Sequence, residues 1–315
     1  MKFIVFVCCL FLFVIIVLPF TVSDTVTTQA SVGNAAPVAS SVAIAPGNLN
    51  GGDIALTANQ TTLINITATI TDNNGCTDID AVNATLFRTN ISGGSGASDN
   101  NRTHYTITSS ACSVEAGSCT GDTDIAANYN CSINVTWYAD PTDAGSLFAG
   151  TNWTVNVTPW DGGGAGTYST TIYDLKTLSS FSLLDTTINF GTLALGQNTT
   201  STNQNVSMQN TGNEGLDFSF TGYGVTSGDN LSMNCTLGNI SIDFFEYNNT
   251  AFNYSEGTSL TNTSTELDFD LDRGSGSENR PENVSYYGFR IPTDGVGGSC
   301  SGTLVIVSTS DPTLD

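Results

Sequence analysis

Short runs in which apolar and polar residues alternate recur along the chain beyond its first twenty residues. Ile64, Ile66, Ala68 and Ile70 alternate with polar neighbours, which is the pattern of a strand that buries one face of a sheet. The same period of two occurs around Cys131–Trp137, Trp153–Val157, Val206–Met208, Leu216–Phe220, Leu231–Cys235, Leu267–Leu271 and Leu304–Val307. After the N-terminal segment no window of twelve or more residues has a 3.6-residue apolar period. The sequence therefore predicts an all-β protein with very little helix.

Turn-forming clusters separate these runs, including Asp72-Asn73-Asn74-Gly75 and Asp161-Gly162-Gly163-Gly164. Strands at this spacing are typical of antiparallel β-sandwiches. At roughly 150 residues a domain, the 315 residues have room for two. We predict one sandwich over residues 37–177, a second over 178–315, and a polar linker over 24–36.

The first twenty residues predict export. Every residue from Phe3 to Phe20 is apolar or is Pro19. This run is long for a signal-peptide core and just long enough to span a bilayer, so residues 1–23 form a cleaved signal peptide or an uncleaved membrane anchor. We favour cleavage, because Pro19 would end the helix and small residues near Ser23 and Ala30 offer cleavage sites. Contact with a membrane is expected only through this segment, if it is uncleaved.

The composition is polar but poor in charge. There are 7 Lys and Arg against 29 Asp and Glu, and charged residues make up 11% of the chain, below the roughly 25% of an average soluble protein. Nucleic-acid binding is excluded as a function class, because neutralising phosphates requires clustered cations. Ser and Thr, 79 in all, take the place of the missing charges.

Six cysteines lie beyond the apolar run: Cys76, Cys112, Cys119, Cys131, Cys235 and Cys300. An even number in an exported chain predicts three disulfides, and none of the six has the close spacing of a zinc site. Cys235 and Cys300 are the only pair in the second domain and should bond to each other. The other four allow three pairings, of which we prefer Cys119 with Cys131 and Cys76 with Cys112.

Asn-x-Ser/Thr sequons, the acceptor sites of N-glycosylation, are unusually frequent. With 31 Asn and 79 Ser plus Thr in 315 residues, random placement gives about 8, whereas 18 are present. On a strand, the period of two would turn the Asn and the hydroxyl outward together. Extensive N-glycosylation is the favoured interpretation, and a neutral hydrogen-bonding surface is the alternative. The sequons begin at Asn59, Asn65, Asn83, Asn90, Asn101, Asn130, Asn134, Asn152, Asn156, Asn198, Asn205, Asn230, Asn234, Asn239, Asn248, Asn253, Asn262 and Asn283.

Several segments resemble a known kind of domain. Residues 190–196 (FGTLALG) and 206–216 (VSMQNTGNEGL) resemble the opening of an immunoglobulin-like repeat found in exported prokaryotic surface proteins, archaeal or from candidate-phylum bacteria. In such repeats the step Asn210-Thr211-Gly212-Asn213 is a turn between strands, as its residue types also predict. Segments 287–292 and 298–304 resemble the closing strands, and 71–75 and 153–163 resemble strand ends of related repeats. The resemblance implies tandem immunoglobulin-like sandwiches and carries no chemistry.

Sites for metals or catalysis are weakly marked. Asp72, Asn74, Asp78 and Asp80 gather at a predicted turn and could bind calcium, with Asp140 or Asp161 from neighbouring loops, although an ordinary Asx-rich turn is the favoured interpretation. The alternating Asp268, Asp270 and Asp272 are expected to be a solvated strand face, since Arg273 replaces the glycine that a calcium loop needs. No cofactor is predicted, with calcium as the one possibility.

Catalysis also has few candidate residues. His104, the only histidine, stands in a Gly/Ser/Asn-rich segment and is expected on a surface loop rather than in a catalytic triad. Tyr247, Tyr254, Tyr286 and Tyr287 could stack on sugars, but alternating aromatics are more often core.

Three functions fit these features. The leading one is a non-catalytic, N-glycosylated structural protein of the cell surface or extracellular space, such as part of a surface layer, filament or envelope scaffold, archaeal if the glycosylation holds. Its partners would be other surface proteins or further copies of itself. The alternatives are an adhesin or ligand-binding module that uses loop tips and, third, a secreted hydrolase whose paired carboxylates the sequence does not single out.

Overall fold

The computed structural model describes residues 24–121, 123–276 and 280–314. Within these residues the chain consists of antiparallel strands and short 3₁₀ turns and contains no α-helix, so the predicted all-β class is confirmed. The predicted signal or anchor segment, 1–23, lies outside the described residues. No helix in the described part of the chain has the length and hydropathy of a membrane span.

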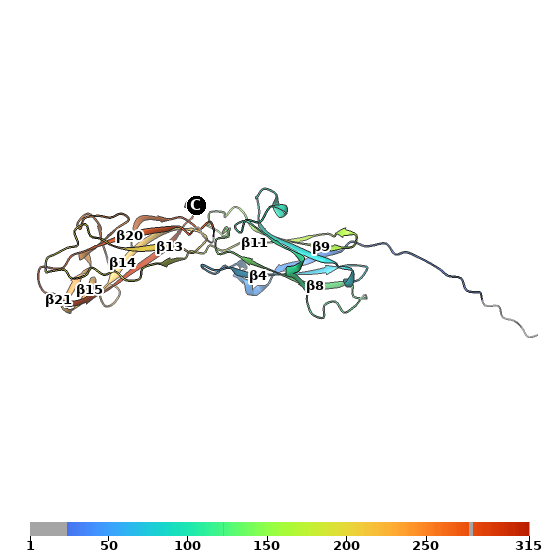
Figure 1. The fold of residues 1–315 in the computed structure, drawn as a ribbon, viewed down its shortest axis with the longest axis horizontal. Helices are drawn as coiled ribbons and strands as arrows, with labels where there is room; N and C mark the ends of the chain where they lie inside the picture. Colours follow the sequence, from blue (N-terminus) through green and yellow to red (C-terminus); the bar gives the residue numbers. More distant parts are fainter. Residues whose placement is uncertain (1–23, 122, 277–279, 315) are drawn as a thin grey trace, which may run out of the picture. The chain divides into compact units, whose positions relative to one another are not determined.

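Two antiparallel sheets form the first sandwich. One has the strand order β1-β4-β8-β7, and the other has the order β10-β9-β5-β6, with β11 also paired to β9. Figure 1 shows β4 and β8 in one layer and β9 and β11 in the other. The strands are β1 Val38–Ile44, β2 Leu49–Asn50, β3 Asp53–Ile54, β4 Thr62–Thr71, β5 Ala81–Arg88, β6 His104–Ile107, β7 Cys112–Val114, β8 Ala126–Val135, β9 Trp153–Asp161, β10 Gly164–Ala165 and β11 Ser169–Tyr173, and the 3₁₀ turns are η1 Pro46–Asn48, η2 Cys76–Asp78, η3 Gly94–Gly96 and η4 Ser109–Ala111.

Three sheets surround the core of the second sandwich. Their strand orders are β12-β13-β20-β17-β18, β19-β14-β22 and β16-β15-β21. The predicted turn at Asn210–Asn213 joins β13 to β14. The elements are β12 Phe181–Leu183, β13 Gln204–Asn210, β14 Gly215–Tyr223, β15 Leu231–Leu237, β16 Asn239–Ser241, η5 Ile242–Phe244, β17 Phe245–Asn248, β18 Thr258–Ser259, β19 Thr265–Leu271, β20 Glu282–Phe289, β21 Gly297–Ser301 and β22 Thr303–Asp311.

Each sandwich has its own hydrophobic core, built from the alternating positions. In β4 the side chains of Ile64, Ile66, Ala68 and Ile70 are buried and those between them are half-exposed. The fully buried residues of the first core fall between 39 and 175, and those of the second between 206 and 289. Residues 34–315 form one compact unit. The boundary between residues 177 and 178 stays a prediction.

The described residues contain three disulfides, and two of them differ from the preferred pairing. Cys235 is bonded to Cys300 across the neighbouring strands β15 and β21. In the first sandwich Cys112 is bonded to Cys131, and Cys76 to Cys119. The preferred pairs, Cys119 with Cys131 and Cys76 with Cys112, are therefore wrong. The reason is strand register: β7 pairs with β8 so that Cys112 lies directly opposite Cys131, which leaves Cys119, in the connecting loop, to reach Cys76.

Candidate functional site

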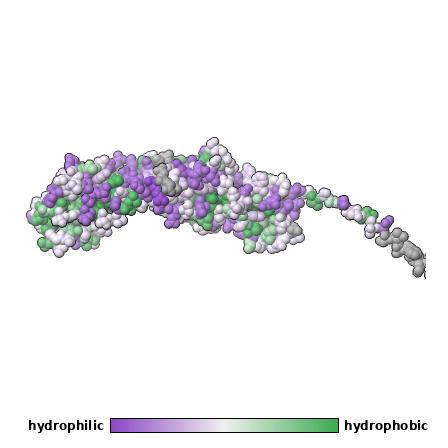
Figure 2. Space-filling model, in the orientation of Figure 1, coloured by the Kyte–Doolittle hydropathy of each residue, from purple (hydrophilic) through white to green (hydrophobic). Residues whose placement is uncertain are grey.

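The sequon asparagines lie on the outside of both sandwiches. None of the eighteen is buried: ten are exposed and eight are half-buried. In the sequons that begin at Asn134, Asn152, Asn156 and Asn205, the middle residue is buried. Strand geometry therefore turns the acceptor nitrogen outward and the apolar neighbour inward. Figure 2 shows hydrophilic and near-neutral side chains over much of the visible face, with hydrophobic side chains in smaller patches.

Two asparagines in the described residues are buried, and neither belongs to a sequon. Asn213 donates from Nδ2 to the carbonyl oxygens of Ala139 and Lys176, each at 3.1 Å. Asn210 donates from Nδ2 to the carbonyl oxygens of Glu214 and Asp272. These two side chains hold the β13–β14 turn in place through hydrogen bonds to backbone carbonyls. The buried asparagines therefore have a structural role that does not involve a sequon.

Backbone geometry explains some of the sequons without any glycan. Asn59, Asn90, Asn101 and Asn230 have positive φ angles, between 59° and 65°, and asparagine tolerates this left-handed conformation better than most residues. No such reason applies to sequon asparagines within strands, such as Asn134 and Asn156. Asparagine is depleted in strands relative to threonine, so backbone conformation does not account for the asparagines at the strand positions.

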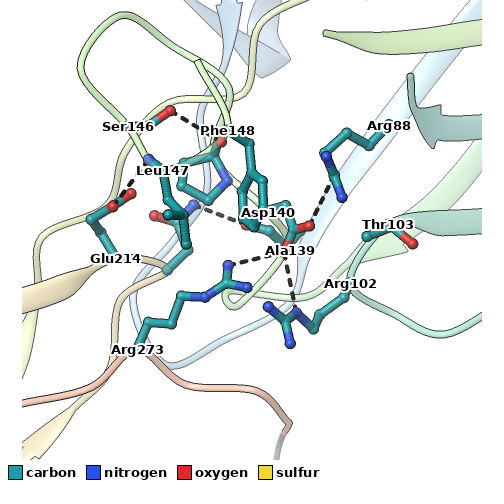
Figure 3. A network of polar contacts seen from close by, with 12 residues as sticks. Arg88, Arg102, Thr103, Ala139, Asp140, Ser146, Leu147, Phe148, Glu214 and Arg273 are labelled. Atoms are coloured by element: carbon teal, nitrogen blue, oxygen red, sulfur yellow. Dashed lines mark hydrogen bonds and ion pairs between the residues drawn. The ribbon is translucent and has the colours of Figure 1, made fainter. Parts of the chain in front are cut away.

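A cluster of arginines around one buried carboxylate lies between the two cores. Asp140 is 1% exposed and follows β8. Its Oδ2 lies 3.0 Å from Nε of Arg88, and its Oδ1 lies 3.2 Å from Nε of Arg102 and 3.0 Å from an Nη of Arg273. Figure 3 shows the three guanidinium groups directed at Asp140 from different segments of the chain. Three of the seven cationic residues of the sequence thus converge on one side chain.

Residues from both sandwiches surround the cluster around Asp140, and we call this region the junction. The ring of Phe148 lies under two of the arginines, with the guanidinium carbons of Arg88 and Arg273 at 4.3 and 4.7 Å from its centroid. Asp140 also accepts a hydrogen bond at its carbonyl oxygen from Nε1 of Trp153, at 2.8 Å. Gly274 packs on Trp137 so closely that any Cβ would collide with the indole ring. Removing Asp140 would therefore take the shared carboxylate from the buried Arg273 and from the partly exposed Arg88 and Arg102.

Glu214 is a second buried carboxylate at the junction. Its side chain is fully buried, and Oε1 accepts a hydrogen bond from the N–H of Leu147 at 3.2 Å. Burial raises the pKa of Glu214 to about 7, and the neighbouring charges of Asp143, Asp311 and Asp140 act in the same direction. The Leu147 hydrogen bond opposes this rise only in part. This carboxyl therefore keeps its proton to a higher pH than an exposed glutamate does.

The predicted calcium ligands do not all meet. Asp72 and Asp78 lie together, but the third carboxylate beside them is Asp161, at the end of β9. Asn74 does not join the carboxylates, because its Oδ1 accepts a hydrogen bond from the N–H of Ala35 at 2.6 Å. Asp80 lies outside the group. Asp140, the other neighbour considered, belongs to the arginine cluster. Asx-turn spacing along one loop thus identified two of the three carboxylates.

A further acidic group lies on the β14 sheet of the second sandwich. Carboxylate oxygens of Asp217, Asp270 and Asp311 lie within 4.8 Å of one another. Burial, followed by the charges of Asp311 and Asp270, raises the pKa of Asp217 to about 6. Asp268, Asp270 and Asp272 are all exposed, so the prediction of a solvated strand face is confirmed.

His104 is buried, which corrects the expectation of a surface loop. It is the first residue of β6 and is 0% exposed. Nδ1 lies 2.8 Å from Oδ1 of Asp99, and Nε2 lies 3.2 Å from the carbonyl oxygen of Ser95. Since Nε2 faces a carbonyl, it must donate there and does not face a serine hydroxyl as it would in a triad. The histidine fastens the 95–104 loop to the sheet.

Two of the tyrosines considered for sugar stacking, Tyr247 and Tyr287, are also 0% exposed and belong to the second core.

No protein-family profile and no curated protein matches the sequence. Solved structures show low likeness to it, with TM-scores below 0.5. The CsuC-CsuE chaperone-tip adhesion subunit complex of Acinetobacter baumannii has 10% identity, covers 81% of this chain and 96% of its own, and has a TM-score of 0.35. The C-terminal domain of the Streptococcus pyogenes protein AspA has 10% identity, covers 89% of this chain and 97% of its own, and has a TM-score of 0.22. The Vibrio cholerae secreted serine protease VesC has 16% identity, covers 82% of this chain and 49% of its own, and has a TM-score of 0.19. Likeness at this level does not bear on function.

Proposed function

We propose that this chain is a non-catalytic, N-glycosylated structural protein of the cell surface, part of a surface layer, filament or envelope scaffold. One observation carries the proposal: all eighteen sequon asparagines are exposed or half-buried, whereas the two buried asparagines lack the motif. A glycosyltransferase must reach the amide nitrogen, and the ten exposed sequon asparagines, which occur on both sandwiches, meet this condition best.

The use of charge supports the same proposal. Arg88, Arg102 and Arg273 are committed to the buried Asp140, and Arg280 lies over the ring of Trp137. The outer faces are left with neutral hydroxyl and amide groups and an excess of carboxylates. Such a surface stays soluble and repels polyanions, while three disulfides resist unfolding outside the cell. These features favour a role that depends on stability and shape rather than on catalysis.

The chemistry of the only histidine agrees with a non-catalytic role. A general base must be within hydrogen-bond reach of the proton that it removes. Both ring nitrogens of His104 instead face acceptors of the protein, Asp99 and the Ser95 carbonyl. The side chain is therefore a structural element of the first sandwich.

The test uses native cells. Antibodies against folded protein are applied to intact and to lysed cells, and the mass of the extracted protein is compared before and after deglycosylation. The full polypeptide has a mass of 32.9 kDa, which removal of residues 1–23 would lower. The proposal predicts labelling of intact cells and a mass excess of several glycans that a glycosidase or chemical deglycosylation removes. Labelling only after lysis would contradict the surface location. Surface labelling with an unmodified mass would favour the neutral hydrogen-bonding surface instead.

A further inference from the structure

Three carboxylates from separate segments meet at one end of the first sandwich. Asp72 follows β4, Asp78 ends the turn η2, and Asp161 ends β9. One carboxylate oxygen of each lies within 4.8 Å of those of the other two. Two oxygens bound to one Ca²⁺ at about 2.3 to 2.6 Å can be up to about 5 Å apart. The three side chains therefore fit around a single ion of this size.

Asp72 has a buried carboxylate oxygen that no protein group contacts through a hydrogen bond. Its side chain is 0% exposed. Oδ1 accepts the N–H of Asn74 at 2.8 Å, but Oδ2 is buried without any hydrogen-bond partner. Buried carboxylates are normally paired with a cation, fully hydrogen-bonded or bound to a metal. An ion between the three carboxylates would supply the missing partner.

The local charge also calls for a cation. In the described residues, no arginine, lysine or histidine forms an ion pair with Asp72, Asp78 or Asp161. Burial raises the pKa of Asp78, and the charges of Asp72, Asp161 and Asp80 raise it further. The carboxylates thus repel one another, and either a shared proton or a bound cation must relieve this repulsion.

Asp161 is held ready as an ionised ligand. Its Oδ1 accepts the N–H groups of Gly163 and Gly164 at 2.7 and 3.0 Å, and its Oδ2 accepts Nδ2 of Asn34 at 2.9 Å. These hydrogen bonds, that of Asn34 foremost, lower the pKa of Asp161. On the opposite side, the disulfide from Cys76 to Cys119 fastens the loop that carries Asp72 and Asp78. The ligands are therefore positioned before any ion arrives.

We propose that Asp72, Asp78 and Asp161 form a Ca²⁺ site that ties the β4 sheet of the first sandwich to its β9 sheet. The donors are all oxygens, which suits calcium rather than zinc. Mg²⁺ prefers a tighter octahedral shell at about 2.0 to 2.1 Å, which fits oxygens this far apart less well. Backbone carbonyls and water would complete the six to eight ligands that calcium takes.

The test is a calcium titration of the purified full chain after treatment with EGTA. Calorimetry should show binding with a Kd of about 10⁻⁴ to 10⁻³ M, the range of extracellular modules. At a Ca²⁺ concentration about 100 times the Kd, the Tm of the first sandwich should rise by about 5 °C or more, and equal Mg²⁺ should have a smaller effect. Asp78→Asn should weaken binding by at least about tenfold, because it removes a charged ligand without disturbing the buried Asp72.

Two variants of equal charge serve as controls. Asp80→Asn removes a nearby carboxylate outside the group, and Asp217→Asn alters the acidic group of the second sandwich; both should retain the Tm shift of the first sandwich. In EGTA, Asp78→Asn should be at least as stable as the wild type, since it relieves repulsion, and in Ca²⁺ it should be less stable. This reversal separates loss of a ligand from misfolding.

Three results would overturn the proposal. The first is no calcium binding by the wild type. The second is a loss in Asp80→Asn equal to that in Asp78→Asn, which would indicate diffuse attraction of cations. The third is a calcium-independent protein whose stability rises as the pH falls from 7 to 5, which would show that a shared proton relieves the repulsion instead.

Discussion

Both sandwiches are built from antiparallel strands, but their cores contain different side chains. The first core is mainly aliphatic, with Ile54, Ile64, Ile66 and Ile70 fully buried, and it contains two disulfides. The second core is aromatic. Phe218 packs edge-on against Phe181 and Phe269 with ring centroids at 5.0 and 5.5 Å, and one disulfide joins its strands.

This difference shows two ways to stabilise a sandwich whose outer faces are polar. Aromatic side chains bury about 150 to 250 Å² each and prefer such edge-to-face contacts, so a few of them supply much of the second core. The smaller side chains of the first core bury less each, and covalent bonds between its strands and loops restrict the unfolded chain instead. We therefore expect the first sandwich to depend more on its disulfides than the second does.

Reduction of the disulfides should have the largest effect and should separate the two sandwiches. Loop-closure entropy assigns about 3 to 4 kcal/mol to each bridge of the first sandwich, although the two loops overlap and the values do not simply add. Two of the three tryptophans, Trp153 and Trp160, lie in β9 of the first sandwich, and Trp137 follows β8 at the junction. Under a reducing agent and increasing urea, tryptophan fluorescence should report unfolding before amide exchange opens β14 and β20. Loss of both signals together would show that the junction couples the two sandwiches into one cooperative unit.

Asp140→Ala should destabilise both sandwiches by about 3 to 5 kcal/mol, the usual cost of breaking a buried ion pair by removing one of its members. The effect should appear in tryptophan fluorescence and in amide exchange alike, because Arg88 and Arg273 belong to different sandwiches. Asp243→Ala, which removes an exposed carboxylate, is the matched control and should change stability by less than about 0.5 kcal/mol. A loss confined to the first sandwich would show that Arg273 does not need this carboxylate.

Glu214→Gln should stabilise the protein at pH 7.5 by on the order of 1 to 2 kcal/mol and have no effect at pH 4.5. An unfolded glutamate loses its proton near pH 4.5, whereas the folded Glu214 keeps it to about pH 7. Because the folded state binds more protons in this window, wild-type stability falls as the pH rises through it. Glutamine can still accept the Leu147 N–H and does not ionise. Urea unfolding at several pH values measures the difference, and destabilisation at pH 7.5 would mean that the charged form is required.

Alternation along single strands could be predicted from the sequence, because the period of two depends only on neighbouring residues. The buried face of β4 and the turn between β13 and β14 are examples. Contacts set by strand register could not be predicted in this way. The Cys112–Cys131 bridge depends on how β7 pairs with β8, and no pattern within either strand indicates that pairing.

The arginine cluster could not be predicted from local sequence patterns either. Arg88, Arg102 and Arg273 are spread over 185 positions of the sequence, and no motif connects them to Asp140. The composition alone gave a hint. With only 7 Lys and Arg in 315 residues, each arginine could be expected to have a specific structural partner. His104 was misplaced because its Gly- and Ser-rich neighbours are typical of loops, although the loop itself covers the side chain.

Site-resolved glycopeptide analysis of protein from its native cells would show whether the sequons of both sandwiches carry glycans. Most of the eighteen sequons should be occupied, including the strand positions Asn134 and Asn156. Occupancy should be lower at Asn152, whose Nδ2 donates to Oδ1 of Asp174 at 2.9 Å, than at the exposed Asn134. Fewer than about five occupied sites, or occupancy limited to the turn positions Asn59, Asn90, Asn101 and Asn230, would contradict the proposed glycosylation and leave the strand sequons as a product of neutral surface composition.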